Sequence, residues 1–135
     1  MRCTTYRDLV LWQKGIDLCE LIYRASSAFP QHELYGLTSQ IRRGAVSVPS
    51  NIAEGAGRIT NGEFVQAVGY ARGSLLEIET QLIIANRLGY LGSTEMDSLF
   101  RATTDVGKLP TVCCFLSSIL IRISPRRTNE VPAKN

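Results

Sequence analysis

Hydrophobic residues recur along most of this chain at steps of three and four, which is the spacing of an amphipathic α-helix. Four long segments show this spacing, and none shows the alternation of apolar and polar residues that is typical of a β-strand. We predict helices over residues 6–28, 34–57, 60–88 and 93–123. The connections between them are short, which favours antiparallel neighbours and an all-α, up-down four-helix bundle.

The apolar positions of each segment predict which side chains fill the core of the bundle. In residues 60–88 they form a strict seven-residue repeat, the pattern that packs helices against one another at shallow angles. The predicted inward positions are Leu9, Trp12, Ile16, Cys19 and Ile22 in the first segment; Leu34, Leu37, Ile41, Ala45, Val48 and Ile52 in the second; Phe64, Val68, Ala71, Leu75, Ile78, Leu82 and Ala85 in the third; and Leu99, Thr103, Val106, Cys113, Leu116 and Leu120 in the fourth.

Capping residues mark some of the expected helix ends. Thr5 is followed three residues later by Asp8, and Thr60 is followed by Glu63, which matches the capping box at the start of a helix. Gly89 comes where the third helix should end, because glycine readily adopts the left-handed conformation of a helix C-cap.

Two prolines lie inside predicted helices. Proline has no backbone N–H, and its ring clashes with the carbonyl group four residues earlier. We therefore expect a kink or a local break at Pro49, and a kink after Val106 that is caused by Pro110.

Three apolar residues of the third segment, Val65, Leu76 and Ile83, lie off its heptad seam. They would form a second apolar stripe on the same helix. Such a stripe either widens the face that packs against the core of the same chain, or forms an interface with another subunit. The pattern leaves both interpretations open.

Length and charge narrow the class of protein. The chain has 135 residues, enough for one ordinary domain, which we place at residues 6–123. Residues 124–135 are polar and hold two prolines, so we expect a disordered tail. The net charge is +3, from 15 Lys and Arg against 12 Asp and Glu, and the tail contributes +2 of it. The body is therefore near neutral, unlike histone-like or ribosomal nucleic-acid binders.

The N-terminal apolar run is interrupted by Lys14, Asp17 and Glu20, so we expect neither a signal peptide nor a membrane span. The cysteines form no C-x-x-C pair and no disulfide pattern, so we expect reduced thiols in a cytoplasmic protein. They are Cys3, Cys19, Cys113 and Cys114.

Catalytic motifs are missing from the sequence. His32 is the only histidine, and it lies in a polar turn near Pro30 with no evident carboxylate partner. There is no P-loop, nucleophile elbow or zinc-protease motif, and the two Glu-x-x-His motifs of a di-iron bundle are also missing. We therefore expect a protein that is not an enzyme and that uses no metal, cofactor or small-molecule substrate.

Polar residues at steps of about four form a stripe along the second predicted helix, opposite its apolar face. Three Arg against one Glu give residues 34–58 a net charge of +2. The stripe is either a solvated face with an i,i+4 ion pair between Glu54 and Arg58, or a surface whose charge is multiplied around a symmetry axis on oligomerisation. Its members are Arg43, Ser47, Asn51, Glu54 and Arg58, flanked by Arg42.

Several runs of this sequence resemble the family of four-helix bundle proteins encoded in 23S rRNA intervening sequences. The resemblance extends over residues 6–123, and it departs from the family pattern at Gly44, where alanine is usual, and at Pro110. The runs that carry it are LTSQIRR at 37–43, VSVPSNIAEG at 46–55, ARGSL at 71–75, EIETQL at 77–82, YRDL at 6–9 and WQK at 12–14.

The resemblance implies a small antiparallel bundle that assembles into a cyclic homo-oligomer, usually a pentamer, with no established catalytic residue. It also implies similarity in fold to accessory proteins of diversity-generating retroelements, which are associated with nucleic acid. Two hypotheses follow: a non-enzymatic oligomer that binds RNA or DNA phosphates, or a protein–protein scaffold whose arginines form intersubunit ion pairs. The candidate residues for either role are Arg42, Arg43, Ser47, Asn51, Glu54, Arg58 and Arg72.

Overall fold

The structure, a computed structural model, describes the backbone of residues 5–123 and the side chains of residues 5–109. Within the described residues every regular element is helical, as predicted. The predicted tail, residues 124–135, lies outside this range. The elements are the 3₁₀ helices η1 (Tyr6–Asp8) and η2 (Gln31–Glu33) and the α-helices α1 (Val10–Ser26), α2 (Leu37–Ala56), α3 (Asn61–Arg87) and α4 (Ser93–Ile123).

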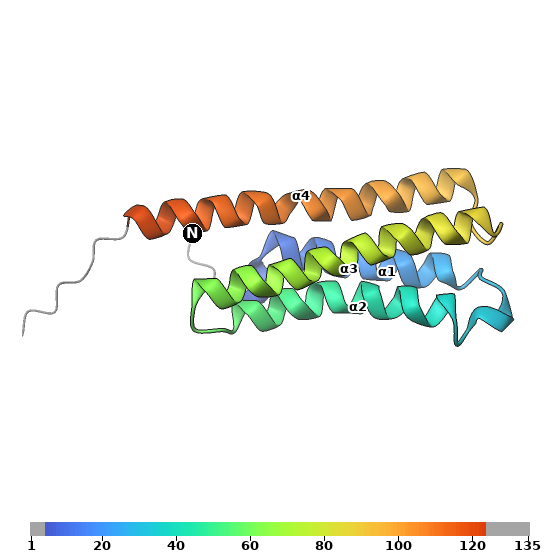
Figure 1. Cartoon of the computed structure of the whole chain (residues 1–135), viewed down its shortest axis with the longest axis horizontal. Coiled ribbons are helices and arrows are strands. Elements are labelled where there is room, and N and C mark those ends of the chain that lie inside the picture. The colour runs from blue at the N-terminus through green and yellow to red at the C-terminus, as the bar shows by residue number, and fades with distance from the viewer. Residues whose placement is uncertain (1–4, 124–135) are drawn as a thin grey trace, which may run out of the picture.

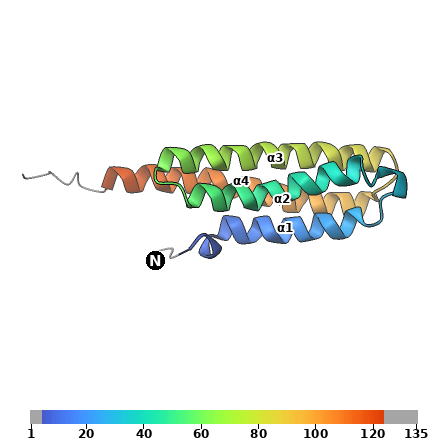
Figure 2. The same cartoon turned by 90° about the horizontal axis from the view of Figure 1, so that it is seen from below.

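The four α-helices run lengthwise beside one another, and each packs against two neighbours (Figures 1 and 2). α2 lies between α1 and α3 on one side of the bundle, and α4 lies between the same two helices on the other side. Successive helices turn back at alternate ends, which is the up-down order expected from short connections. This order places α2 in contact with both α1 and α3.

The first two predicted helices begin later than expected. Leu9 is extended (φ −72°, ψ 121°), so residues 6–8 form a separate 3₁₀ turn and the α-helix starts at Val10. The predicted capping box of Thr5 and Asp8 is present, and it caps this short turn. The second α-helix starts at Leu37, where the Glu33 carboxylate accepts a hydrogen bond from the Leu37 N–H at 2.9 Å.

The predicted core face of the first helix is correct only in part. Ile22 is buried, and Leu9, Trp12 and Cys19 are partly buried and pack against the core. Ile16 is 40% exposed, and the fully buried seam passes through Leu11, Gly15 and Leu18 before it reaches Ile22. Gly15 explains the error, because a glycine in the seam removes the apolar signal at that position. A Cβ atom there would lie 3.4 Å from the Pro49 Cβ, so α1 and α2 approach closely through Gly15.

The second and third helices bury almost the faces that were predicted. The whole heptad seam of α3 from Val68 to Ala85 is buried, with Phe64 packed partly buried at its start. In α2 the predicted positions from Ile41 to Ile52 are buried, whereas Leu34 precedes the helix and is exposed. In α4 the predicted positions Leu99, Thr103 and Val106 are buried, and Cys113, Leu116 and Leu120 lie outside the described side chains.

The local break, one of the two outcomes expected at Pro49, does not occur. Pro49 is buried inside α2, which is continuous from Leu37 to Ala56. Nearby side chains bond to carbonyl groups of the preceding turn: Ser50 Oγ donates to the Val46 carbonyl at 2.7 Å, and Asn51 Nδ2 donates to the Ser47 carbonyl at 2.8 Å. The carbonyl that loses its N–H partner to Pro49 is that of Ala45, so these bonds hold the neighbouring positions of the turn and do not replace the lost bond. α4 likewise continues past Pro110 to Ile123.

Glycines allow α2 and α3 to approach closely. A Cβ atom on Gly55 would lie only 2.5 Å from the Ala67 Cβ, well inside van der Waals contact. A Cβ atom on Gly44 would lie 3.2 Å from Ile78 Cγ1. The departure from the family pattern at Gly44 therefore coincides with a close contact between these two helices.

The second apolar stripe of α3 is not part of the core. Val65, Leu76 and Ile83 are 44%, 56% and 37% exposed in the single chain.

α3 ends as predicted, with Gly89 in the left-handed conformation at φ 78°. No helix among residues 5–123 combines the length and the hydropathy needed to cross a membrane.

Candidate functional site

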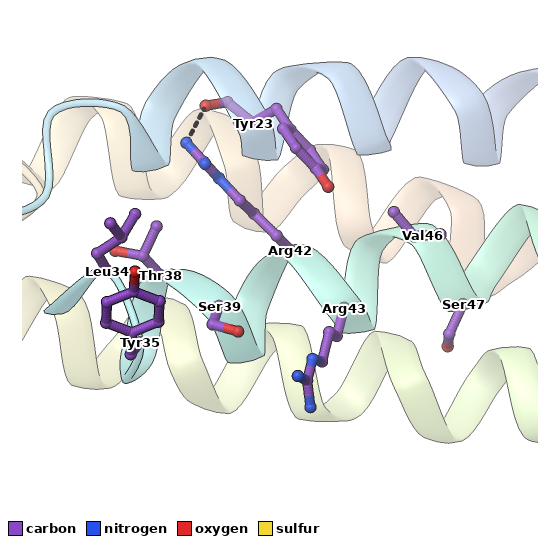
Figure 3. Close-up of a pocket in the computed structure, with 9 residues that line it drawn as sticks. All are labelled: Tyr23, Leu34, Tyr35, Thr38, Ser39, Arg42, Arg43, Val46 and Ser47. Carbon is purple, nitrogen blue, oxygen red and sulfur yellow. Dashed lines mark hydrogen bonds between the residues drawn. The ribbon is translucent and has the colours of Figure 1, made fainter.

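The polar residues of α2 do not form one uniform surface, because they leave the helix on two different sides. Figure 3 shows that Arg42 points toward α1, whereas Arg43 and Ser47 point away from it. Arg42, Arg43 and Ser47 all line one pocket of about 540 Å³ between α1 and the start of α2. Glu54 lies about three turns further along the helix and Arg58 follows the end of the helix, and both line a different pocket.

Arg42 holds the end of α1. Its Nε donates to Ser26 Oγ at 2.8 Å, and one terminal nitrogen lies 3.4 Å from both the Tyr23 carbonyl and Ser27 Oγ. The guanidinium also lies over the Tyr23 ring, 4.8 Å from its centroid. A cation at a helix C-terminus that satisfies terminal carbonyl groups stabilises that helix. Arg42 is therefore a structural residue as well as a pocket residue.

The guanidinium of Arg43, unlike that of Arg42, is not held by a neighbouring helix. It is exposed, and it makes no hydrogen bond or ion pair with any other residue whose side chain the structure describes. It also borders a second pocket between α2 and α3, of about 530 Å³, together with Gly44, Glu77 and Gln81. The Oε1 atom of Gln81 is buried there without a hydrogen-bond partner.

The middle of the predicted stripe joins α2 to α3. Ser47 Oγ forms a short hydrogen bond with Ser74 Oγ of α3, and Asn51 donates to the Ser47 carbonyl. Both α2 side chains are partly buried. These two members of the stripe therefore contribute to helix packing, which the polar pattern alone did not indicate.

The last two members form the predicted i,i+4 ion pair. Arg58 contacts the Glu54 carboxylate at 2.6 Å, and both side chains are more than half exposed. They line a pocket of about 360 Å³ with Glu63, Gln66 and Tyr70 of α3. Hydrogen bonds from the Thr60 hydroxyl and backbone N–H, which complete the predicted capping box, lower the pKa of Glu63. This pocket holds two carboxylates and one cation, so it does not favour an anion.

Arg72 lies apart from the other candidates. It is an exposed residue of α3, and it lines none of the three pockets described above. On the helical repeat of α3 it falls close to Val65, Leu76 and Ile83, the exposed apolar stripe. The structure therefore separates Arg72 from the arginines of α2.

The pocket between α1 and α2 contains residues that the sequence did not single out. These are Tyr23 at the end of α1, Leu34 and Tyr35 before α2, and Thr38 in its first turn. Gly36 was the available signal for Tyr35. Its backbone is not helical (φ −108°, ψ −116°) and α2 begins after it, so Tyr35 precedes the helix and is exposed.

His32 has a carboxylate partner, contrary to the expectation from sequence. Its Nε2 lies 3.3 Å from the Tyr90 hydroxyl and 3.9 Å from Glu33 Oε1, and Tyr90 in turn donates to Glu33 Oε1 at 3.2 Å. Burial and the Glu33 carboxylate raise the pKa of Tyr90. This cluster joins the α1–α2 and α3–α4 connections and has no pocket beside it among those described here.

Cys19 is a free, half-buried thiol, and burial raises its pKa, which makes it less reactive. The other three cysteines lie outside the described side chains. Across residues 5–109 no group of three His, Cys, Asp or Glu side chains is arranged to hold a metal ion.

Comparison with known families gives one match that covers most of the chain. The model of the 23S rRNA-intervening sequence protein family matches residues 7–111, more than half of the chain. The chain belongs to this family. The comparison with curated proteins gave no match.

A solved structure shares the fold of this intervening-sequence protein. It is a protein of unknown function from the S23 ribosomal protein family of Bacteroides thetaiotaomicron VPI-5482. The two chains are 20% identical with a TM-score of 0.72, and the match covers 77% of this chain and 97% of the other. At this identity the likeness shows the fold and not the function.

Proposed function

We propose that this protein is a non-enzymatic, self-assembling helical bundle that binds nucleic acid through its phosphates. The observation that carries the proposal is the composition of the pocket between α1 and α2. Two arginines, Arg42 and Arg43, line it, and no carboxylate does. Arginine forks suit phosphate groups and position a strand without reading its sequence.

The four arginines considered from the sequence are not equal in this role. Arg42 already bonds to α1, and Arg58 is paired with Glu54. Arg43 has a free guanidinium at the pocket. We therefore assign the main phosphate contact to Arg43, with Arg42 as a fixed positive charge beside it.

Self-assembly is supported by the exposed stripe of α3. Val65, Leu76 and Ile83 are large apolar side chains that the single chain leaves in contact with water. Gly69 lies on the same side of α3, and apart from the backbone of α3 itself no atom of the described residues comes within 4 Å of its ideal Cβ position, which leaves room for a second helix. We propose a cyclic homo-oligomer, with five subunits favoured by the family resemblance.

Assembly would raise the affinity of a weak site. One free arginine per chain gives little affinity for a polyanion, but several copies around a ring bind the same strand at once. A chain whose body is near neutral can therefore bind nucleic acid once several copies are assembled.

The binding test is the salt dependence of affinity for a short single-stranded RNA or DNA. We expect affinity to fall steeply with salt, and Arg43→Gln to weaken binding at low salt. Arg101, an exposed residue of α4 outside the pockets, supplies the matched control Arg101→Gln. If the wild-type protein does not bind at low salt, the nucleic-acid proposal is wrong.

The assembly test is the mass of the protein in solution. A single chain has a mass of 14.9 kDa. We expect a multiple of this value for the wild-type protein and single chains for Leu76→Glu, which places a charge in the stripe. A wild-type protein of single-chain mass would refute assembly.

A protein–protein scaffold that binds no nucleic acid is the second candidate. The engagement of Arg42 with α1 and of Arg58 with Glu54 favours it, because both arginines then have a structural explanation. An assembled protein without salt-sensitive binding would support this function instead.

A further inference from the structure

The pocket between α1 and α2 combines a free cation with an aromatic side chain. Tyr35 is 94% exposed at the edge of the pocket. Ser39 and Arg43 lie one helical turn apart on α2, and Tyr35 precedes the helix and lines the same pocket. In Figure 3, Tyr35, Ser39 and Arg43 form a row, and Ser39 and Arg43 leave α2 on its side away from α1.

Two hydroxyl groups line the pocket beside this cation. Thr38 is largely buried and Ser39 is half-buried, and neither hydroxyl is hydrogen-bonded to another residue that the structure describes. Both hydroxyls are therefore available to a polar ligand in the pocket.

From these features we propose that the pocket binds one nucleotide unit of single-stranded nucleic acid, with the base stacked on Tyr35 and the phosphate on Arg43. The proposal rests on the phosphate-binding function proposed above and adds the class of ligand. One helical turn, about 5.4 Å, separates Ser39 from Arg43, so the Ser39 hydroxyl and the guanidinium reach the same phosphate.

A single strand fits these residues better than a duplex does. In a duplex the base faces are stacked on one another, whereas an unpaired base has a free face for an aromatic side chain. An exposed tyrosine beside a basic groove is the arrangement by which proteins bind single strands with little sequence preference. Nothing in the row reads a base edge, so we expect little sequence preference here too.

The test uses a short single strand, RNA or DNA, with 2-aminopurine as the fluorescent base, at low salt and with the full chain. We expect stacking to quench the fluorescence on binding. Tyr35→Leu should weaken binding about tenfold or more and remove the quenching, and Tyr35→Phe should retain both. Because Tyr35 is almost fully exposed, neither variant should lose helical circular dichroism.

Tyr70→Leu is the matched control, because Tyr70 is an exposed tyrosine of α3 outside this pocket. We expect it to bind and quench as the wild type does. A duplex of the same sequence should bind more weakly than the strand, and a nucleoside monophosphate should compete only at far higher concentration.

The possible failures are distinguishable. If Arg43→Gln weakens binding but Tyr35→Leu does not, and duplex and strand bind equally, the phosphate function stands and the stacking proposal is wrong. If a monophosphate binds as tightly as the strand, the ligand is a free nucleotide and the single-strand proposal is wrong. If no oligonucleotide binds, both proposals fail.

Discussion

The close contact between α2 and α3 at Gly55 makes a quantitative prediction. In Gly55→Ala the new Cβ would lie 2.5 Å from the Ala67 Cβ, whereas carbon atoms pack at about 3.5–4.0 Å. The helices must then separate locally by about 1 Å, and such overpacking costs about 1–3 kcal/mol. The better helix propensity of alanine returns at most about 1 kcal/mol. We therefore expect the free energy of unfolding to fall by about 1–2 kcal/mol.

For a chain of this length a loss of that size lowers Tm by about 4–8 °C. Thermal unfolding followed by far-UV circular dichroism, at one fixed protein concentration, measures it. The control is Gly62→Ala near the start of α3, where the nearest atom to a new Cβ is Thr60 Oγ1 at 4.0 Å. We expect Gly62→Ala to be neutral or slightly stabilising. A Gly55→Ala protein as stable as Gly62→Ala would refute the reasoning.

Three further predictions concern single side chains. Arg42→Ala should lower the free energy of unfolding by about 1–3 kcal/mol in urea titrations, because it removes hydrogen bonds of a charged group to α1. The control Arg43→Ala should change the free energy of unfolding by less than about 0.5 kcal/mol. Thr60→Ala should cost about 1 kcal/mol in the same titrations, since it removes the N-cap of α3. The raised pKa of Tyr90 means that folding favours the protonated phenol. The contribution of this phenol to the free energy of unfolding should therefore be complete below the usual tyrosine pKa and be lost as the pH rises through the raised value. Tyr90→Phe should not show this loss when Tm is measured as a function of pH.

The helix count and most of the core of α2 and α3 could be predicted from the sequence, because their apolar residues repeat without interruption. The first helix could not be placed in the same way. Its buried seam passes through Gly15, which contributes no hydrophobic signal, and Ile16, which the apolar spacing placed in the core, is exposed. A close approach of helices depends on the partner helix, and no pattern within one segment reveals it.

The candidate site was predicted only in part. The polar stripe indicated α2, whose residues line the pocket of the proposal, and the predicted Glu54–Arg58 pair is confirmed. The separate roles of Arg42 and Arg43 did not follow, because adjacent residues on a helix point about 100° apart and only the neighbouring helix decides which one is satisfied. Tyr35 was missed because it precedes the helix that carries the stripe.

The carboxylate of Glu33 has a consequence for local unfolding. It accepts a hydrogen bond from the first N–H of α2 and another from Tyr90, which lies 57 residues away in the sequence. The connection between α2 and α3 at the opposite end is held by the bonds between Thr60 and Glu63, three residues apart. Hydrogen exchange should therefore show the α1–α2 and α3–α4 connections opening as one cooperative unit, while the residues around Thr60 open independently of them.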